Sequence, residues 1–166
     1  MAEHTPERQR HGFAPIYDER SAVLVLGSFP SVRSREEGFY YAHPRNRFWP
    51  LLARVFGRGL PRDDSERQAL LLENGVALWD VAERCDIVGS SDASIRSVSA
   101  NDISPILAEC DIREIIANGT TAARLYRELI EPRTGRAITA LPSTSPANAA
   151  WTPERLFAAW GPHLIR

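Results

Sequence analysis

Short apolar runs alternate with segments of helical periodicity along most of the chain. Between the first two runs, apolar side chains from Phe48 to Phe56 recur at helical spacing. Strands that alternate with helices are typical of a parallel sheet covered by helices. The pattern therefore predicts one α/β domain with a four-stranded parallel sheet. The four runs expected as strands are residues 22–26, 76–79, 114–117 and 137–141.

Turn and capping signals set the remaining boundaries. Residues 1–20 are polar and lack a periodic element, so we expect an N-terminal arm there. A single domain is expected over residues 21–166, with a long loop after the second strand through Asp92. Further helices are expected from 65 to 74, from 103 to 110, for about ten residues after 120, and from 153 onward.

The composition is that of an ordinary globular protein, with 43% hydrophobic and 25% charged residues. The apolar runs are too short to span a membrane, and the chain does not open on a signal-peptide pattern. Cys85 and Cys110 are isolated, so we expect neither a zinc site nor an iron–sulfur cluster. We therefore expect a cytoplasmic protein in a reducing compartment.

Positive charge is concentrated in one part of the chain, although the formal net charge is only -1. Between residues 31 and 62, seven arginines stand against two acids. Such a block is either a solvated face or a surface that contacts phosphates. Its members are Arg33, Arg35, Arg45, Arg47, Arg54, Arg58 and Arg62.

The stretch from Gly27 to Trp49 holds the densest group of chemically capable residues. It follows the first predicted strand, and ligands of open α/β sheets usually bind beyond the carboxyl ends of the strands. Asn46 falls just before the next helix, where backbone N–H groups favour an anion. Its amide could orient a water, read the edge of a base, or simply cap the helix.

Other residues in these loops allow more than one interpretation. One of the three adjacent aromatics at 39–41 could offer its ring to a base while the others pack in the core. The hydroxyls at 143–145 suit either phosphate oxygens or an ordinary turn. His43 has no second ligand at metal-binding spacing. The acids Asp80, Asp86 and Asp92 are too scattered to be assigned as an acid–base pair.

Two stretches resemble the uracil-DNA glycosylase superfamily: GSFPSVRSREEGFYYAHPRNRFWPLLA, and STSPAN near the C-terminus. They are most similar to the hypoxanthine-DNA (deoxyinosine) glycosylase branch, which NGVALWDV and GSSDASI also fit. The segment GFYYAHPRNRFW is similar to the mismatch-specific uracil-DNA glycosylases as well. The resemblance spans residues 21–160 in matching order. It implies a three-layer α/β/α fold and an enzyme that flips a damaged nucleotide and hydrolyses its N-glycosidic bond without a cofactor or metal.

Carried over by position, the resemblance assigns roles to the residues of two motifs. Tyr41 takes the place of the aromatic that stacks on the flipped base. The second motif, Pro142 to Asn148, grips the strand and fills the space that the base leaves. The first motif supplies the expected substrate-binding residues Gly27, Ser28, Phe29, Pro30 and Ser31. The expected DNA contacts are Arg33, Arg35, Arg45, Ser143, Thr144, Ser145, Ala147 and Asn148.

Two positions depart from the relatives that act on uracil. Phe29 stands where those relatives carry Asn or Asp to position the attacking water. Ser143, which stays among the expected substrate-binding residues, stands where they carry His or Asn to steady the leaving uracil. The deoxyinosine branch resembles this chain in both respects and relies on the asparagine of HPRN. The resemblance therefore implies that Asn46 is the catalytic residue.

We therefore predict a monofunctional DNA glycosylase that releases hypoxanthine from deoxyinosine in base-excision repair. Its partner would be DNA containing deaminated bases, and we expect the protein to be a monomer. We expect it in the cytoplasm, associated with the nucleoid if the source is a prokaryote. Two alternatives remain open. The chain could be a uracil or mismatch-specific glycosylase on the same scaffold, or a catalytically silent module that binds DNA lesions.

Overall fold

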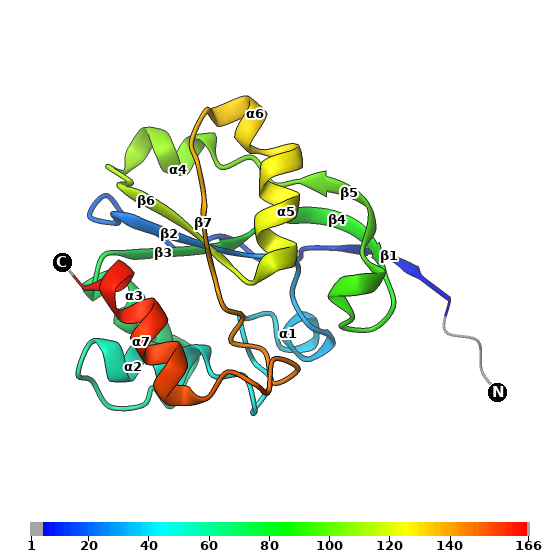
Figure 1. Ribbon diagram of the computed structural model, residues 1–166. Coiled ribbons are helices and arrows are strands. Elements are labelled where there is room, and N and C mark those ends of the chain that lie inside the picture. The colour runs from blue at the N-terminus through cyan, green and yellow to red at the C-terminus, as the bar shows by residue number, and fades with distance from the viewer. Residues whose placement is uncertain (1–4, 166) are drawn as a thin grey trace.

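The computed structural model describes residues 5–165, which form two sheets and the helices around them (Figure 1). The larger sheet is parallel, with strand order β3-β2-β6-β7. This confirms the predicted α/β class and all four predicted strands. Their bounds are β2 (Val23–Gly27), β3 (Val76–Asp80), β6 (Glu114–Asn118) and β7 (Thr139–Leu141).

Helices cover both faces of this sheet, so the domain has the three layers that the resemblance implied (Figure 1). One face carries α2 (Phe48–Val55), α3 (Asp64–Glu73) and α7 (Pro153–Leu164). The opposite face carries α4 (Ser104–Glu109) and α5 (Thr120–Leu129), with the short α6 (Glu131–Thr134) after α5.

The alternation of side chains along β2 explains why both faces are covered. Leu24 and Leu26 join the core under α4 and α5, whereas Val23 and Val25 join the core under α2, α3 and α7. All four side chains are at most 3% exposed. A strand buried on both faces reads as a continuous apolar run, and this is why the pattern revealed it.

A second, antiparallel sheet of order β1-β4-β5 was not predicted. The long loop expected after β3 is wrong, because β4 begins two residues after β3 ends. The segment expected as an N-terminal arm packs against this sheet, since β1 pairs with β4 and Ile16 forms a bridge with Leu78 of β3. The first four residues of that arm lie outside the described residues. The hydrophobic pattern did not predict β1 and β4 because their solvent-facing residues are polar. The bounds are β1 (Glu7–Arg10), β4 (Ala82–Ile87) and β5 (Arg96–Ala100).

A short helix, α1 (Val32–Glu37), interrupts the loop that was expected between Gly27 and α2. The Ser31 hydroxyl caps it by accepting from the Ser34 N–H, and Gly38 ends it with φ 71°. Only one residue of α1 is apolar, so no periodicity marked it. Asp63 caps α3 and Thr152 caps α7, each by accepting from a backbone N–H three residues further on.

Parallel strands direct their carboxyl ends to one edge of the sheet. The ends of β2, β3 and β6 therefore bring Gly27, Asp80 and Asn118 together at that edge. In the described residues, no helix is long and apolar enough to cross a membrane.

Candidate active site

A cavity of about 780 Å³ opens at the carboxyl edge of the parallel sheet. This volume lies in the range of small-molecule sites, roughly 300–1,000 Å³. Its walls come from segments that are far apart in the sequence. They include residues 27–31 from the end of β2, Tyr41, Asn46, Asp80 at the end of β3, residues 90–93, Asn118 at the end of β6, and residues 140–148 from the end of β7.

The floor of the cavity is a close approach between two strand ends. Gly27 of β2 is paired in register with Asp80 of β3. A Cβ atom on residue 27 would lie 2.2 Å from Asp80 Oδ1 and 2.9 Å from the Tyr41 hydroxyl. Glycine is therefore required at this position, because any side chain would displace a carboxylate and a phenol from the cavity.

Asn46 is held so that only its amide nitrogen remains available. Its Oδ1 accepts hydrogen bonds from the Phe48 N–H and from the Thr144 hydroxyl, both at 2.9 Å. A backbone N–H can only donate, so the atom facing Phe48 must be the oxygen. No hydrogen bond of Nδ2 occurs within residues 5–165. Asn46 thus serves the start of α2 through its oxygen and presents a donor to the cavity.

Asn118 and Thr144 fix the loop after β7 against the sheet. Asn118 Nδ2 donates to the Thr144 hydroxyl and Asn118 Oδ1 accepts from the Thr144 N–H, both at 3.0 Å. The Thr144 side chain is fully buried. Thr144 was expected to contact DNA, but the structure uses its hydroxyl to connect Asn118 to Asn46.

Arg47 ties the same loop to the start of α2. Its guanidinium donates to the carbonyl oxygens of Thr144 at 3.3 Å, Ser145 at 2.7 Å and Asn148 at 3.1 Å, and to that of Trp151. The Arg47 N–H also donates to the Thr144 carbonyl at 3.1 Å. The sequence analysis placed Arg47 in a block that could contact phosphates. In the structure its N–H donors are instead hydrogen-bonded to backbone carbonyls.

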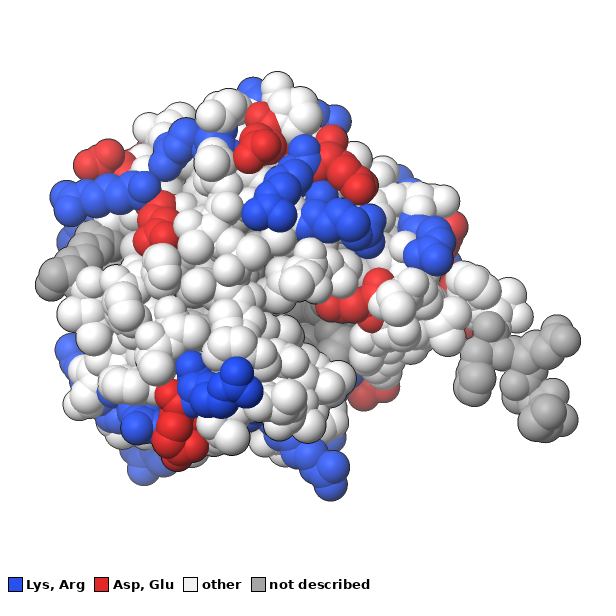
Figure 2. Space-filling view, in the orientation of Figure 1, with Lys and Arg blue, Asp and Glu red and all other residues white. Residues whose placement is uncertain are grey.

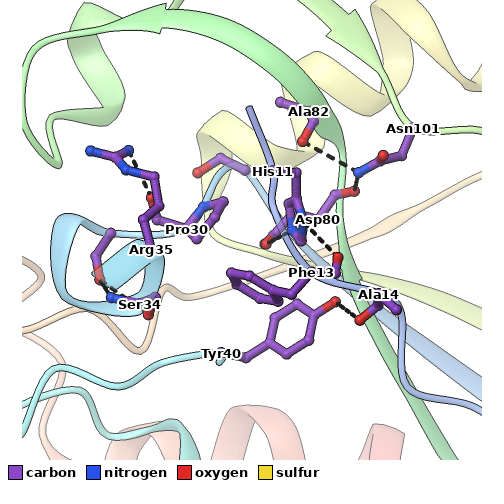
Figure 3. Close-up of polar contacts among 12 residues, drawn as sticks. His11, Phe13, Ala14, Pro30, Ser34, Arg35, Tyr40, Asp80, Ala82 and Asn101 are labelled. Carbon is purple, nitrogen blue, oxygen red and sulfur yellow. Dashed lines mark hydrogen bonds and ion pairs between the residues drawn. The ribbon is translucent and has the colours of Figure 1, made fainter. Parts of the chain in front are cut away.

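The three arginines expected to bind DNA have different environments. Arg35 donates to the carbonyl of Pro30 at 3.1 Å (Figure 3) and to that of Gly89, also at 3.1 Å. Its guanidinium lies 5.4 Å from the centre of the Phe29 ring. Arg33 pairs with Glu37 at 2.6 Å on the exposed side of α1. Arg45 is exposed. On the face seen in Figure 2, arginines are scattered around the margins and do not gather in one patch.

Of the three adjacent aromatics, only Tyr41 retains a part-exposed ring. Phe39 and Tyr40 are buried, and the Tyr40 hydroxyl donates to the Ala14 carbonyl at 2.8 Å (Figure 3). Tyr41 has φ 51°, and its ring centre lies 4.2 Å from that of Phe48. The Tyr41 hydroxyl is buried and has no partner within the described residues. Burial, reinforced by the nearby charge of Asp80, raises the pKa of Tyr41.

The remaining motif residues form the rim of the cavity. The Ser28 hydroxyl donates to Asp92 Oδ1 at 2.7 Å, which links the first motif to the loop after β4. Phe29 is 8% exposed and packs mainly into the core, although it borders the cavity. The Ser143 hydroxyl accepts from the Ser145 N–H at 3.1 Å, an ordinary turn contact. Ala147 lies exposed near the tip of this loop.

Sequence reasoning missed the buried pair of His11 and Asp80 (Figure 3). His11 Nε2 lies 2.7 Å from Asp80 Oδ2. Their separation of 69 residues hid the contact. The one available signal was an acid placed directly at the end of a buried apolar run.

No group of three potential metal ligands occurs among the described residues. Burial raises the pKa of the Cys85 thiol to about 11, which leaves it protonated at neutral pH.

Comparison with known proteins agrees over nearly the whole chain. Residues 14–163 match the model of the Uracil DNA glycosylase superfamily. The chain is 33% identical to a Hypoxanthine DNA glycosylase of Methanosarcina acetivorans over 148 residues, which cover 88% of this chain and 92% of the relative. A Hypoxanthine DNA glycosylase of Methanosarcina barkeri is 35% identical over 97 residues, 58% of this chain and 61% of the relative.

The fold also matches a solved structure. It is the solution NMR structure of a protein from Methanosarcina acetivorans that is provisionally assigned as a uracil DNA glycosylase. The TM-score is 0.79 at 30% sequence identity, and the match covers 96% of this chain and all of the other.

We expect Arg47→Met to loosen the loop after β7 while leaving the two sheets folded. Four carbonyls would lose a charged donor, and a hydrogen bond to a charged group contributes about 1.5–3 kcal/mol. Amide hydrogen exchange in residues 143–151 should therefore accelerate. Arg45→Met is the matched control, since Arg45 is exposed. Unchanged exchange in the Arg47 variant would contradict the role assigned to this side chain.

Proposed function

Because the chain belongs to the uracil-DNA glycosylase superfamily, we propose that it hydrolyses the N-glycosidic bond of deoxyinosine and releases hypoxanthine from DNA. Two relatives named for this activity support the proposal. The observation that carries it in this chain is the state of Asn46. With Oδ1 committed to Phe48 and Thr144, its Nδ2 is the donor that remains in the cavity wall to meet an acceptor of a bound purine.

The proposed reaction begins when the nucleotide leaves the duplex and its base enters the cavity. The bond between C1′ of the sugar and N9 of the base breaks, and both electrons stay with the base. Asn46 Nδ2 and the backbone N–H groups of Ser28 and Phe29 stabilise the negative charge that grows on the purine. Water then adds to C1′ of the cationic sugar and loses a proton to solvent, and the purine anion takes up a proton and leaves as neutral hypoxanthine. Tyr41 contacts the base within the cavity.

DNA would approach the rim formed by the loop after β7. The exposed tip at Ala147 would enter the space that the flipped base leaves, and the exposed side chains of Arg33 and Arg45 would contact phosphates. Arg35 would act indirectly, since its donors already hold the carbonyls of Pro30 and Gly89. The protein would bind as a monomer to DNA that contains deaminated bases.

The proposal is tested by single-turnover base release from matched duplexes containing either deoxyinosine or deoxyuridine. Hypoxanthine offers the acceptors O6 and N7, whereas uracil has no counterpart of N7. Uracil would thus leave one buried donor unpaired, at about 1–3 kcal/mol, which corresponds to roughly 5- to 150-fold in rate. Equal release of both bases would favour a uracil or mismatch-specific enzyme. Binding without release of either base would favour a lesion-binding module.

Two substitutions of Asn46 test its role in catalysis. Asn46→Ala should lower hypoxanthine release by about 10²–10³-fold, the usual effect of removing one donor that stabilises developing charge. Asn46→Asp keeps an oxygen for the Phe48 N–H and the Thr144 hydroxyl but replaces the donor with an acceptor. It should therefore fold normally and also lose activity.

The matched control for both variants is Asn74→Ala, because Asn74 caps the distant end of α3. A fully active Asn46→Asp variant would mean that Asn46 acts on water as an acceptor.

The salt dependence of binding tests the proposed DNA surface. Each phosphate contact contributes about 0.9 to the slope of log affinity against log salt concentration. The double variant Arg33→Gln and Arg45→Gln should therefore lower that slope by up to about 1.8. Arg58→Gln is the control, since Arg58 pairs with Glu73 of α3, away from the cavity. An unchanged slope would identify both arginines as part of a solvated face.

A further inference from the structure

The carboxyl group of Asp92 lies in the cavity wall, on the loop that follows β4. Among the described residues, one other carboxyl group lines the cavity, that of Asp80. Asp80 is 3% exposed at the floor and hydrogen-bonded to His11, whereas Asp92 is exposed. The sugar of a flipped nucleotide stays attached to the DNA backbone, so C1′ lies nearer to the rim than the base does. Asp92 is therefore the carboxyl group better placed to meet the sugar.

Hydrogen bonds to the first motif and to α1 hold the loop of Asp92 in place beside that helix (Figure 1). The Ser28 hydroxyl donates to Asp92 Oδ1 at 2.7 Å. The Val32 N–H at the start of α1 donates to the Ser90 hydroxyl at 2.9 Å, and Arg35 of the same helix donates to a carbonyl of this loop. Asp92 thus has a fixed position before any substrate arrives.

The protein uses only one oxygen of the Asp92 carboxyl group. None of the hydrogen bonds and ion pairs within residues 5–165 reaches Oδ2, so this oxygen can accept a hydrogen bond from a molecule in the cavity. The surrounding protein removes water from the carboxyl group and thereby raises the pKa of Asp92, which the hydrogen bond from Ser28 opposes only in part. A carboxylate with a raised pKa is a stronger proton acceptor than an ordinary one.

The negative charge of Asp92 has opposite effects on DNA binding and on bond breaking. An acid at the rim repels the phosphates of approaching DNA. The same charge becomes favourable once the glycosidic bond starts to break, because positive charge then develops on the sugar. The reaction therefore gives a reason for an acid at this position, whereas DNA binding does not.

We propose that Asp92 is a second catalytic residue, which stabilises the cationic sugar and accepts a proton from the attacking water through Oδ2. This inference rests on the proposed function. The bond from the water oxygen to C1′ forms as one O–H bond of the water breaks. The proton passes to the carboxylate and from there to solvent, which regenerates the carboxylate. Asn46 acts on the departing base, and Asp92 acts on the sugar and the water.

The main test is Asp92→Asn, whose amide oxygen can still accept from the Ser28 hydroxyl but whose side chain carries no charge and accepts no proton. Single-turnover release of hypoxanthine should fall by about 10²-fold or more, the low end of what a positioned base contributes. Affinity for an undamaged duplex should stay the same or rise, since a charge that repels phosphates is gone. Asp86→Asn is the matched control, because Asp86 on β4 pairs with Arg8 and is not part of the cavity wall.

Chemical rescue of Asp92→Ala provides a second test, because this variant leaves space for a small carboxylate. Sodium formate should raise its rate by about tenfold, by supplying part of the missing base contribution. It should leave the wild-type rate unchanged. Sodium chloride at the same concentration is the control for the effect of salt on DNA binding. Thermal unfolding would establish that each variant is folded.

The outcomes separate this inference from the proposed function. A wild-type protein that does not release hypoxanthine overturns both. An active wild-type protein whose Asp92→Asn variant keeps the full rate overturns only the role of Asp92, because the residue would then serve only to hold Ser28. A slow Asp92→Asn variant that also binds undamaged DNA more weakly would likewise overturn it. So would an Asp92→Ala variant that formate does not accelerate.

Discussion

The contact of one arginine with four carbonyl groups is the constraint on which the cavity depends. Arg47 at the start of α2 binds the carbonyls of a loop about a hundred residues further along the chain. A half-buried guanidinium must find acceptors for its donors, and carbonyl oxygens satisfy them without a second charge. The guanidinium carries five N–H donors and can therefore meet four carbonyls at once, whereas a lysine ammonium has only three donors. The two sequence motifs are thereby fixed against each other.

This constraint also determines the state of the catalytic candidate. Once the loop after β7 is held, the Thr144 hydroxyl donates to Asn46 Oδ1 and accepts from Asn118 Nδ2. Each amide and hydroxyl in this chain of contacts has one direction available, set by the backbone N–H groups of Phe48 and Thr144. The donor that Asn46 offers to the cavity is thus set by contacts within the cavity walls themselves. Such preorganised donors need no rearrangement at the moment of bond breaking.

The sequence predicted the part of the structure that depends on local pattern. The parallel strands are buried on both faces, so their apolar runs are visible, and Thr152 with Pro153 marks the start of α7. The antiparallel sheet was not predictable in this way, because its strands read as polar segments. The site divides similarly. Its loops could be located at the strand ends, and the catalytic role that the resemblance assigned to Asn46 stays a prediction. The hydrogen bonds of Arg47 to the loop after β7 and the pairing of His11 with Asp80 join segments that are distant in the sequence. Residue spacing cannot reveal such contacts.

The antiparallel sheet brings a residue that precedes the family match to the edge of the site. The family match begins at residue 14, so Asp80 lies inside it and His11 lies outside. Pairing of β1 with β4 brings the chain across the end of β3, and the His11 N–H donates to the Glu83 carbonyl at 2.7 Å as the pairing ends. A short polar strand at the edge of a small sheet thereby delivers an imidazole to a buried carboxyl group. The acid at the cavity floor thus acquires its partner from a segment that precedes the family match.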